Sequence, residues 1–305
     1  MIGGRIRAAR LEKGLGLREV ARRIPMNPGY LSQIEHGLRV PSSQMLADLG
    51  GVLGVDLASA IAPMPIGLNT DSLSRLADVL GTQRRLEDTI GAAPLVASTV
   101  AQLRFITKMV IDARGPLRRG ALDIAAQWAQ FTGWLHAAVE RYADSDRWFS
   151  RSLEWAIEAD NDDLVATVLS YKGHVMWLRG KPEPTIGLSQ AARRHGHIYP
   201  GQLAYDMLQE ARGHAILGNA YAVDRLVGES DEMTDRALRE LPGAPPWHYY
   251  RSPAFWNLER GRALARLPGR EKKATELLTA GLDGLPADQR AADWVGAYRR
   301  DLAAL

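Results

Sequence analysis

The segment at residues 27–37, N-P-G-Y-L-S-Q-I-E-H-G, contains both the start signal and the stop signal of one short helix. Asn27 can cap the N-terminus, Pro28 suits a first turn that needs no N–H, and Gly37 can take the left-handed conformation that ends a helix. Between these signals, Leu31 and Ile34 share one face. The segment therefore predicts a short helix, one face of which packs into an apolar core.

The opposite face of this helix is polar. Gly29, Ser32, Gln33 and His36 fall together on it, and Tyr30 lies at its edge. Amide, hydroxyl and imidazole groups bind base edges and phosphates in a DNA major groove, and a glycine permits close approach. This face favours a DNA-reading helix.

Three further amphipathic segments surround the polar helix. Residues 3–13 and 17–24 predict two basic helices before it, and residues 41–54 predict a fourth helix after it. Over residues 2–57 the chain resembles the Cro/cI-type (XRE-family) helix-turn-helix domain, whose Y-L-S-x-I-E-x-G stretch corresponds to residues 30–37. The small residue of its second helix is Ala21, and its recognition-helix core pair is Leu31 and Ile34.

The resemblance implies a DNA-binding role for seven residues. Gly29, Ser32 and Gln33 would face bases, whereas Arg18, Asn27, Tyr30 and Arg39 would lie near phosphates. Two positions depart from the family pattern, since Leu17 replaces the usual glutamine and Pro25 replaces the usual turn glycine. The proline fixes φ, so the turn must follow a different path. The alternative is a four-helix interaction domain that has lost DNA binding.

Composition agrees with a DNA-binding part joined to a larger part. The chain has 305 residues, enough for two domains, and its net charge is +3. Residues 1–56 hold eight basic and five acidic residues, so the positive surplus lies on the candidate DNA-binding part, as phosphate attraction requires. No cysteine is present. No signal-peptide pattern, long apolar run or phosphate-loop, zinc or nucleophile-elbow motif occurs. We expect a cytoplasmic protein that is not an enzyme, with no cofactor, no metal site and no membrane span.

The rest of the chain is predicted to be all-helical. Residues 1–60 form the helix-turn-helix domain, and residues 61–70, with two prolines and a glycine, form a linker. Residues 71–120 are connecting helices, with short helices at 71–80 and 83–90 and a long one at 93–113, and residues 121–305 form a repeat domain.

Four glycines mark an internal repeat in the last domain. Gly133, Gly173, Gly213 and Gly261 are separated by 40, 40 and 48 residues, and an amphipathic segment follows each one. Recurring helix pairs of this kind stack into an α-solenoid. The region resembles tetratricopeptide repeats, although their period is about 34 residues and most of their aromatic and proline consensus positions are missing.

This second resemblance implies a binding groove. Side chains one after, three before and four after each glycine would point into the concave face of the solenoid. The predicted groove residues are Gln130, Trp134, Ser170, His174, Trp177, Glu210, His214 and Arg262. Mixed aromatic and polar groups suit a peptide or a small polar molecule. The alternatives are that neighbouring helices satisfy some of these groups, or that His174, His214 and Glu210 serve a metal or an enzymatic site.

The two resemblances together predict a bacterial transcription regulator. The repeat domain would bind a peptide or small-molecule ligand and mediate a homodimer, which a palindromic operator requires because its half-sites lie about 34 Å apart. The domain order resembles that of peptide-sensing regulators of Gram-positive bacteria, but the ligand does not transfer with domain order. The alternative is a protein-interaction scaffold in which the repeat domain binds a partner protein and DNA binding is secondary or lost.

Overall fold

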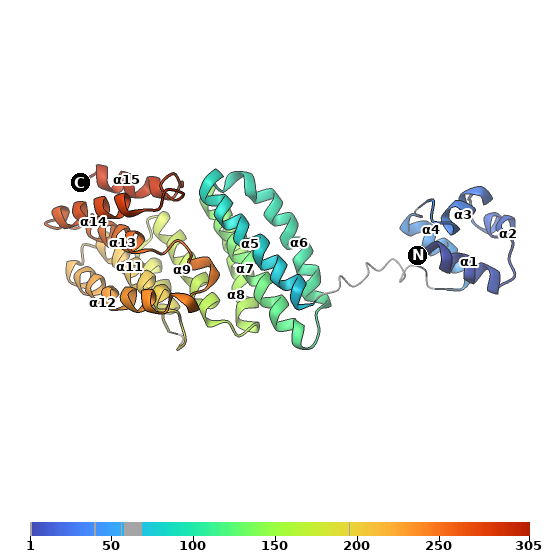
Figure 1. Cartoon of the computed structure of the whole chain (residues 1–305), viewed down its shortest axis with the longest axis horizontal. Helices are drawn as coiled ribbons and strands as arrows, with labels where there is room; N and C mark the ends of the chain where they lie inside the picture. Colours follow the sequence, from blue (N-terminus) through green and yellow to red (C-terminus); the bar gives the residue numbers. More distant parts are fainter. Residues whose placement is uncertain (1, 40, 56, 58–68, 195) are drawn as a thin grey trace. The chain divides into compact units, whose positions relative to one another are not determined.

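The computed structural model describes residues 2–39, 41–55, 57, 69–194 and 196–305 (Figure 1). The chain divides into two compact units, Met1–Gly67 and Leu68–Leu305. Within the described residues both units are all-helical, without strands, so the predicted fold class is confirmed. The predicted linker at residues 61–70 lies outside the described residues, except for Asn69 and Thr70, which cap and begin the next helix.

The described residues of the N-terminal unit form a bundle of four helices around one apolar core. The helices are α1 (Ile2–Glu12), α2 (Leu17–Arg23), α3 (Pro28–Glu35) and α4 (Ser43–Leu53). Each contributes residues that are fully or almost fully buried, including Ile6, Val20, Leu31, Ile34, Leu46 and Leu49. Gly54 ends α4 with a φ of 65°, as predicted.

The turn before α3 takes the path that its proline dictates. Ile24 is extended, with φ of −127° and ψ of 138°, as a residue before proline must be. The Met26 N–H then donates to the Ile24 carbonyl at 2.7 Å, which closes a tight turn around Pro25. Leu17 is half-buried against the core of the unit, so this side chain is used for packing.

The second unit begins with helices that pack against its first hairpin. They are α5 (Thr70–Ile90), the 3-10 turn η1 (Ala93–Leu95) and α6 (Val96–Asp112), and both long helices contact α7 (Figure 1). The prediction of separate helices at 71–80 and 83–90 is wrong, because α5 continues through Gly81. A helical glycine costs only about 1 kcal/mol, and the burial of Leu80 and Arg84 on either side holds the helix together.

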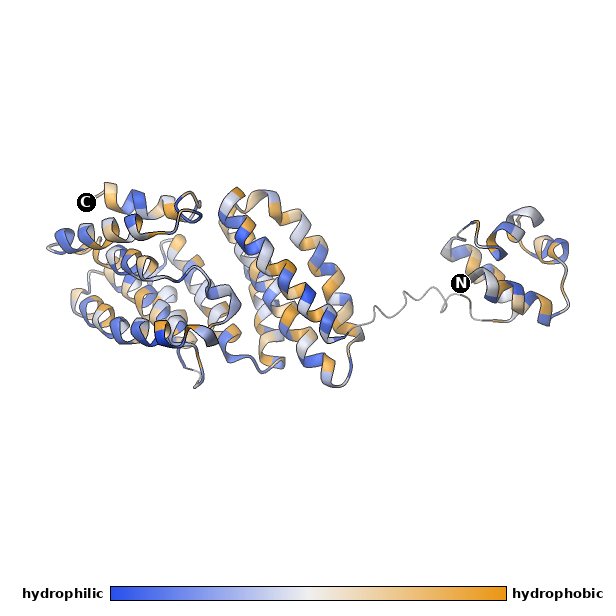
Figure 2. Ribbon diagram, viewed as in Figure 1, coloured by the Kyte–Doolittle hydropathy of each residue, from blue (hydrophilic) through white to orange (hydrophobic). Residues whose placement is uncertain are grey.

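Four helical hairpins and a final helix complete this unit. The hairpins are α7 (Pro116–Ala138) with α8 (Tyr142–Glu158), α9 (Asp162–Leu178) with α10 (Pro182–Ala192), α11 (Pro200–Ile216) with α12 (Ala220–Arg239), and α13 (Pro253–Leu264) with α14 (Glu271–Gly284). The 3-10 turns η2 (Leu241–Gly243) and η3 (Pro246–His248) precede α13, and α15 (Val295–Ala303) packs on α13 and α14. Most helices carry both hydrophobic and hydrophilic residues, as amphipathic elements do (Figure 2).

The repeat glycines lie where helices touch. A Cβ added to Gly133 or Gly261 would come within 2.7 Å of Phe149 or Leu278, on the second helix of the same hairpin. These glycines therefore permit a close approach that a larger residue would prevent.

One stretch, Ala93–Ile111, is long and apolar enough to cross a membrane by length and composition alone. Leu103, Ile106 and Val110 of this stretch are buried in the same core as α7, however. We therefore assign η1 and α6 to the packed core of the second unit.

Candidate DNA-binding face and ligand cavity

Local interactions fix the α3 helix as its sequence predicts. The Asn27 side chain accepts a hydrogen bond from the Gly29 N–H at 2.7 Å, Pro28 is the first helical residue, and Gly37 has a φ of 75°. Leu31 and Ile34 have no exposed surface. These two side chains determine which face of α3 remains free.

The free face carries the polar groups expected of it. Gly29, Gln33 and His36 are exposed, Ser32 is half-buried, and Tyr30 is half-buried against the core. His36 Nδ1 donates to the Ser32 carbonyl at 2.8 Å, because a carbonyl oxygen can only accept. The face therefore presents an amide that can donate and accept, together with a hydroxyl and an imidazole.

The residues expected near phosphates are also at the surface. Arg18, Asn27 and Arg39 are exposed. Among the residues that the structure describes, neither Arg18 nor Arg39 forms an ion pair, so both guanidinium groups are available to an external anion.

A buried ion pair ties the recognition helix to α1, and sequence reasoning missed it. Arg10 Nε and Nη2 donate to the two Glu35 carboxylate oxygens at 2.6 and 2.7 Å, and the side chains are only 9% and 2% exposed. Gly3 lies against the same end of α3, where an added Cβ would come within 2.1 Å of the Ile34 carbonyl oxygen. These contacts set the position of α3 relative to α1.

The second unit contains a cavity of about 510 Å³. The residues that line it come from α5, α7, α8, α9, α11, α13 and α15, and from the segments before α13 and α15. Five of the eight predicted groove residues are among them: Gln130, Trp134, His174, Trp177 and Arg262. The structure brings these five together, and their binding of a ligand remains a prediction.

Aromatic rings form much of the cavity wall. Twelve of the 21 aromatic residues of the chain line it. Trp134 contacts Tyr171 edge to face, with ring centroids 5.6 Å apart, and the His174 and Trp177 rings are 5.5 Å apart. Such walls bind flat apolar groups through dispersion and ring contacts.

His174 is the centre of a hydrogen-bonded chain at the cavity. Arg212 Nη2 donates to the Tyr205 hydroxyl at 3.3 Å, and that hydroxyl lies 3.2 Å from His174 Nδ1. Burial and the nearby charges of Arg212 and Arg262 hold the pKa of His174 well below its usual range. The ring is therefore neutral, with Nδ1 accepting from Tyr205 and Nε2 carrying the proton.

The C-terminal end of α5 closes one side of the cavity. Asp88 accepts hydrogen bonds from the Tyr249 hydroxyl at 2.5 Å and from Trp294 Nε1 at 3.2 Å, and Glu87 accepts from Trp134 Nε1 at 3.3 Å. Burial and the neighbouring Asp88 carboxylate raise the pKa of Glu87 to about 7. Both carboxyl groups therefore form part of the cavity wall and already accept hydrogen bonds from neighbouring side chains.

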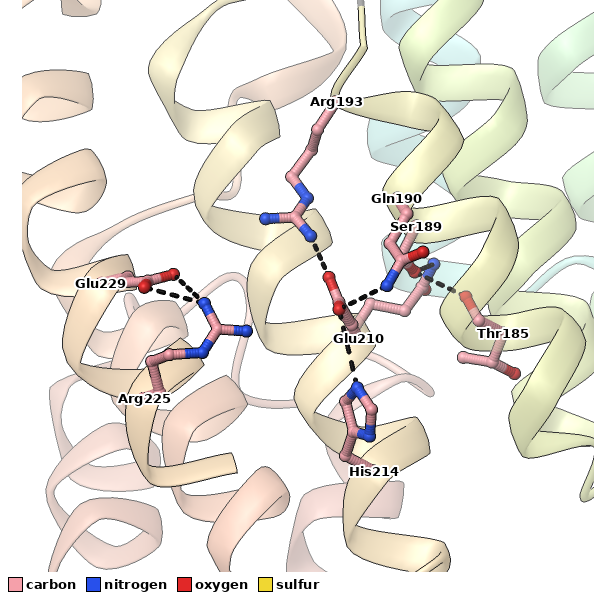
Figure 3. A network of polar contacts seen from close by, with 9 residues as sticks. Thr185, Ser189, Gln190, Arg193, Glu210, His214, Arg225 and Glu229 are labelled. Atoms are coloured by element: carbon pink, nitrogen blue, oxygen red, sulfur yellow. Dashed lines mark hydrogen bonds and ion pairs between the residues drawn. The ribbon is translucent and has the colours of Figure 1, made fainter. Parts of the chain in front are cut away.

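The other three predicted groove residues do not line the cavity. Ser170 is buried, and its carbonyl accepts from Gln209 Nε2 of α11 at 2.9 Å. Glu210 accepts from Gln190 Nε2 at 2.9 Å, pairs with Arg193, and lies 3.6 Å from His214 (Figure 3). These three residues therefore lie outside this cavity, and a role in ligand binding for them stays a prediction.

The reason lies in the orientation of α11. A Cβ added to Gly213 would come within 2.7 Å of Ile186 on α10, which belongs to the preceding hairpin. Residues three before and one after this glycine lie on the same helix face. Glu210 and His214 consequently face α10, and Tyr205 is the α11 residue that reaches the cavity.

Several cavity residues were absent from the predicted set. Arg84, Glu87 and Asp88 come from α5, which sequence reasoning treated as a connecting helix. Tyr249 and Tyr250 come from the aromatic W-H-Y-Y run, whose unusual composition was the one available signal.

The metal alternative is not supported by the placement of its residues. His174 faces the cavity, whereas His214 and Glu210 face α10. Within the part of the chain that the structure describes, no three histidine, aspartate or glutamate side chains are grouped so that they could hold a metal ion.

The four-helix bundle and the exposed face of α3 define a helix-turn-helix domain. Residues 2–60 match a protein family described as "Helix-turn-helix domain". The chain is also similar to the transcriptional regulator ClgR of Mycobacterium tuberculosis, from strains CDC 1551 / Oshkosh and ATCC 25618 / H37Rv, with 33% identity over 107 residues. That alignment covers 94% of each relative and 33% of this chain. No solved structure matches the chain. The chain therefore belongs to the helix-turn-helix family of transcriptional regulators.

Proposed function

We propose that this protein is a sequence-specific DNA-binding regulator whose second unit senses a peptide or small-molecule ligand and mediates homodimerisation. The observation that carries the DNA-binding part is the geometry of α3. Buried Leu31 and Ile34 fix its inner face, and Gln33 stands exposed on the outer one. A glutamine at that position can form two hydrogen bonds to the edge of an adenine in the major groove.

The phosphate contacts are proposed for the groups around this helix. Arg18 and Arg39 are exposed cations without a protein partner among the described residues. Such side chains orient a protein on DNA without reading its sequence, and they make binding weaken steeply with salt. The name of the M. tuberculosis relatives supports a regulatory role for this chain as well.

The small number of base pairs that one helix-turn-helix domain can contact supports the proposed homodimer. A single helix reads a few base pairs, and two copies spaced by one DNA turn read a palindrome with the affinity that regulation requires. We place this function in the cytoplasm, where bacterial DNA is accessible. Analytical ultracentrifugation of the full chain should give a dimer.

The ligand-sensing part of the proposal rests on the cavity. Its volume of about 510 Å³ and its aromatic wall are typical of small-molecule and short-peptide sites. A ligand there would regulate DNA binding only by favouring one conformation of the dimer over another.

The test is selection from a random duplex library with wild-type protein and with Gln33→Ala. We expect wild type to enrich a palindrome, and the variant to lose about 1–3 kcal/mol of discrimination at one base pair in each half-site. Gln44→Ala is the matched control, because Gln44 is an exposed amide on α4 that bonds Asp48 within its own helix.

Two outcomes would contradict the proposal. An unchanged motif with Gln33→Ala would show that α3 does not read bases in this way. Absence of enrichment from folded protein, with and without cell extract, together with a stable heteromeric complex that tolerates Gln33→Ala, would favour the scaffold function.

A further inference from the structure

The inference starts from a buried cation that forms no ion pair among the described residues. Arg84 lies on α5, lines the cavity, and is only 6% exposed. Its guanidinium forms no ion pair and donates no hydrogen bond among the described residues, and its Nη2 is fully enclosed. The guanidinium carbon lies 5.6 Å from the centre of the Trp247 ring. An unpaired buried charge is costly, and proteins rarely retain one without a use for it.

The other buried arginines near the cavity do not remove this imbalance. Arg212, Arg251 and Arg262 are also at least nine-tenths buried. Arg212 pairs with Glu259 at 3.5 Å, and Arg262 pairs with Asp301 at 2.6 Å. Arg251 donates to the Gly201 carbonyl and to Gln202 but forms no ion pair within the described chain. Of these four buried guanidinium groups, two have a carboxylate partner, whereas Arg84 and Arg251 form no ion pair within the described residues.

The aromatic part of the cavity wall is suited to a ring. The cavity presents the faces and edges of Trp134, Tyr171 and Trp177, and the neutral His174 ring offers a donor nitrogen. The two acids on α5 do not call for a cationic ligand, because Glu87 and Asp88 already accept bonds from Trp134, Tyr249 and Trp294.

We infer that the cavity binds an aromatic carboxylate, as a free small acid or at the C-terminus of a short peptide, with its carboxylate paired to Arg84. This inference names the ligand class for the sensing role proposed above and rests on that role. A guanidinium and a carboxylate form a charge-assisted, two-pronged contact, which is stronger inside a cavity than in water.

Calorimetric titration of the whole chain tests the inference with three probes that share one aromatic ring system but differ in charge. The probes are 2-naphthoate, 2-naphthamide and 2-naphthylmethylammonium. We expect the acid to bind about 10- to 100-fold more tightly than the amide, because the amide cannot form the charge-assisted pair. A tripeptide that ends in phenylalanine, tested as free acid and as C-terminal amide, shows whether the carboxylate can come from a peptide.

Variants then assign the preference to Arg84. Arg84→Met should remove the preference for acid over amide while leaving amide binding unchanged, and Arg84→Lys should retain part of the preference. Arg75→Gln is the matched control, since Arg75 lies on the same helix with its side chain 75% exposed. Circular dichroism confirms folding of each variant.

The inference fails if no acid binds, if acid and amide bind equally, or if folded Arg84→Met keeps the preference. Duplex selection on the same protein preparations separates this failure from failure of the proposed function. Intact duplex selection without acid binding overturns the ligand class alone. Acid binding by a protein that selects no duplex overturns the regulatory function alone.

Discussion

Glu35→Ala is expected to unfold the N-terminal unit and abolish DNA binding while the second unit stays folded. The change leaves the Arg10 guanidinium buried without its carboxylate, at a cost of about 3–5 kcal/mol. Arg10 keeps only the Leu15 carbonyl, which accepts from it at 2.9 Å. A domain of this small size has a total stability of about the same magnitude.

Thermal denaturation followed by circular dichroism measures this effect. We expect wild type to show transitions for both units, and Glu35→Ala to lose the one that belongs to the N-terminal unit. The double variant Arg10→Met/Glu35→Leu should restore it, because an apolar pair often replaces a buried ion pair without loss. Glu19→Ala, which removes only an exposed pair with Arg23, should change stability by less than about 1 kcal/mol. A full N-terminal transition in Glu35→Ala would contradict the importance of the pair.

Glu87→Gln is expected to stabilise the second unit at high pH and to have little effect at low pH. The folded unit retains the Glu87 proton up to a pKa of about 7, whereas the ordinary value is 4.5. Between these pH values the folded state binds more protons than the unfolded state, so the free energy of unfolding decreases as pH rises. Glutamine has no proton to lose, and it can still accept from Trp134 Nε1.

The expected difference is about 2–3 kcal/mol in favour of Glu87→Gln at about pH 8, and close to zero near pH 4.5. Urea denaturation at both pH values measures it. The Asp88 and Asp293 carboxylates repel an ionised Glu87 but not a neutral glutamine, so this repulsion is part of the expected difference. Glu154→Gln, at a side chain that is 63% exposed, is the control. An equal effect of Glu87→Gln at both pH values would mean that ionisation of Glu87 is not its cause.

The parts of the fold that depend on neighbouring residues were predictable from the sequence. The α3 helix is the clearest case, because its cap at Asn27, its core pair and its terminal glycine all act within eleven residues. The repeat glycines were also informative, because each lies where a side chain would collide with a neighbouring helix. Gly81 was misleading, because packing over the whole of α5 outweighs one unfavourable residue.

The parts of the site that depend on distant residues were not predictable. The Arg10–Glu35 pair joins residues 25 positions apart, and no pattern in the sequence distinguishes it from pairs that never meet. The groove rule named Trp134 on α7 and His174 on α9, which line the cavity. On α11, whose glycine contacts a different hairpin, it named residues that do not line it. Nothing in the sequence around Arg84 distinguishes it from an exposed helix arginine, although its side chain is buried in the structure.

The cavity is closed by residues that lie far apart in the sequence, and this has a consequence for truncated chains. Tyr249 and Trp294 meet Asp88 across 161 and 206 residues of chain. During synthesis, the N-terminal unit is complete long before the segment with Trp294, which closes the cavity, emerges from the ribosome. Nonsense alleles that end the chain just before Trp294 should therefore encode proteins with a complete N-terminal unit but an incomplete cavity wall.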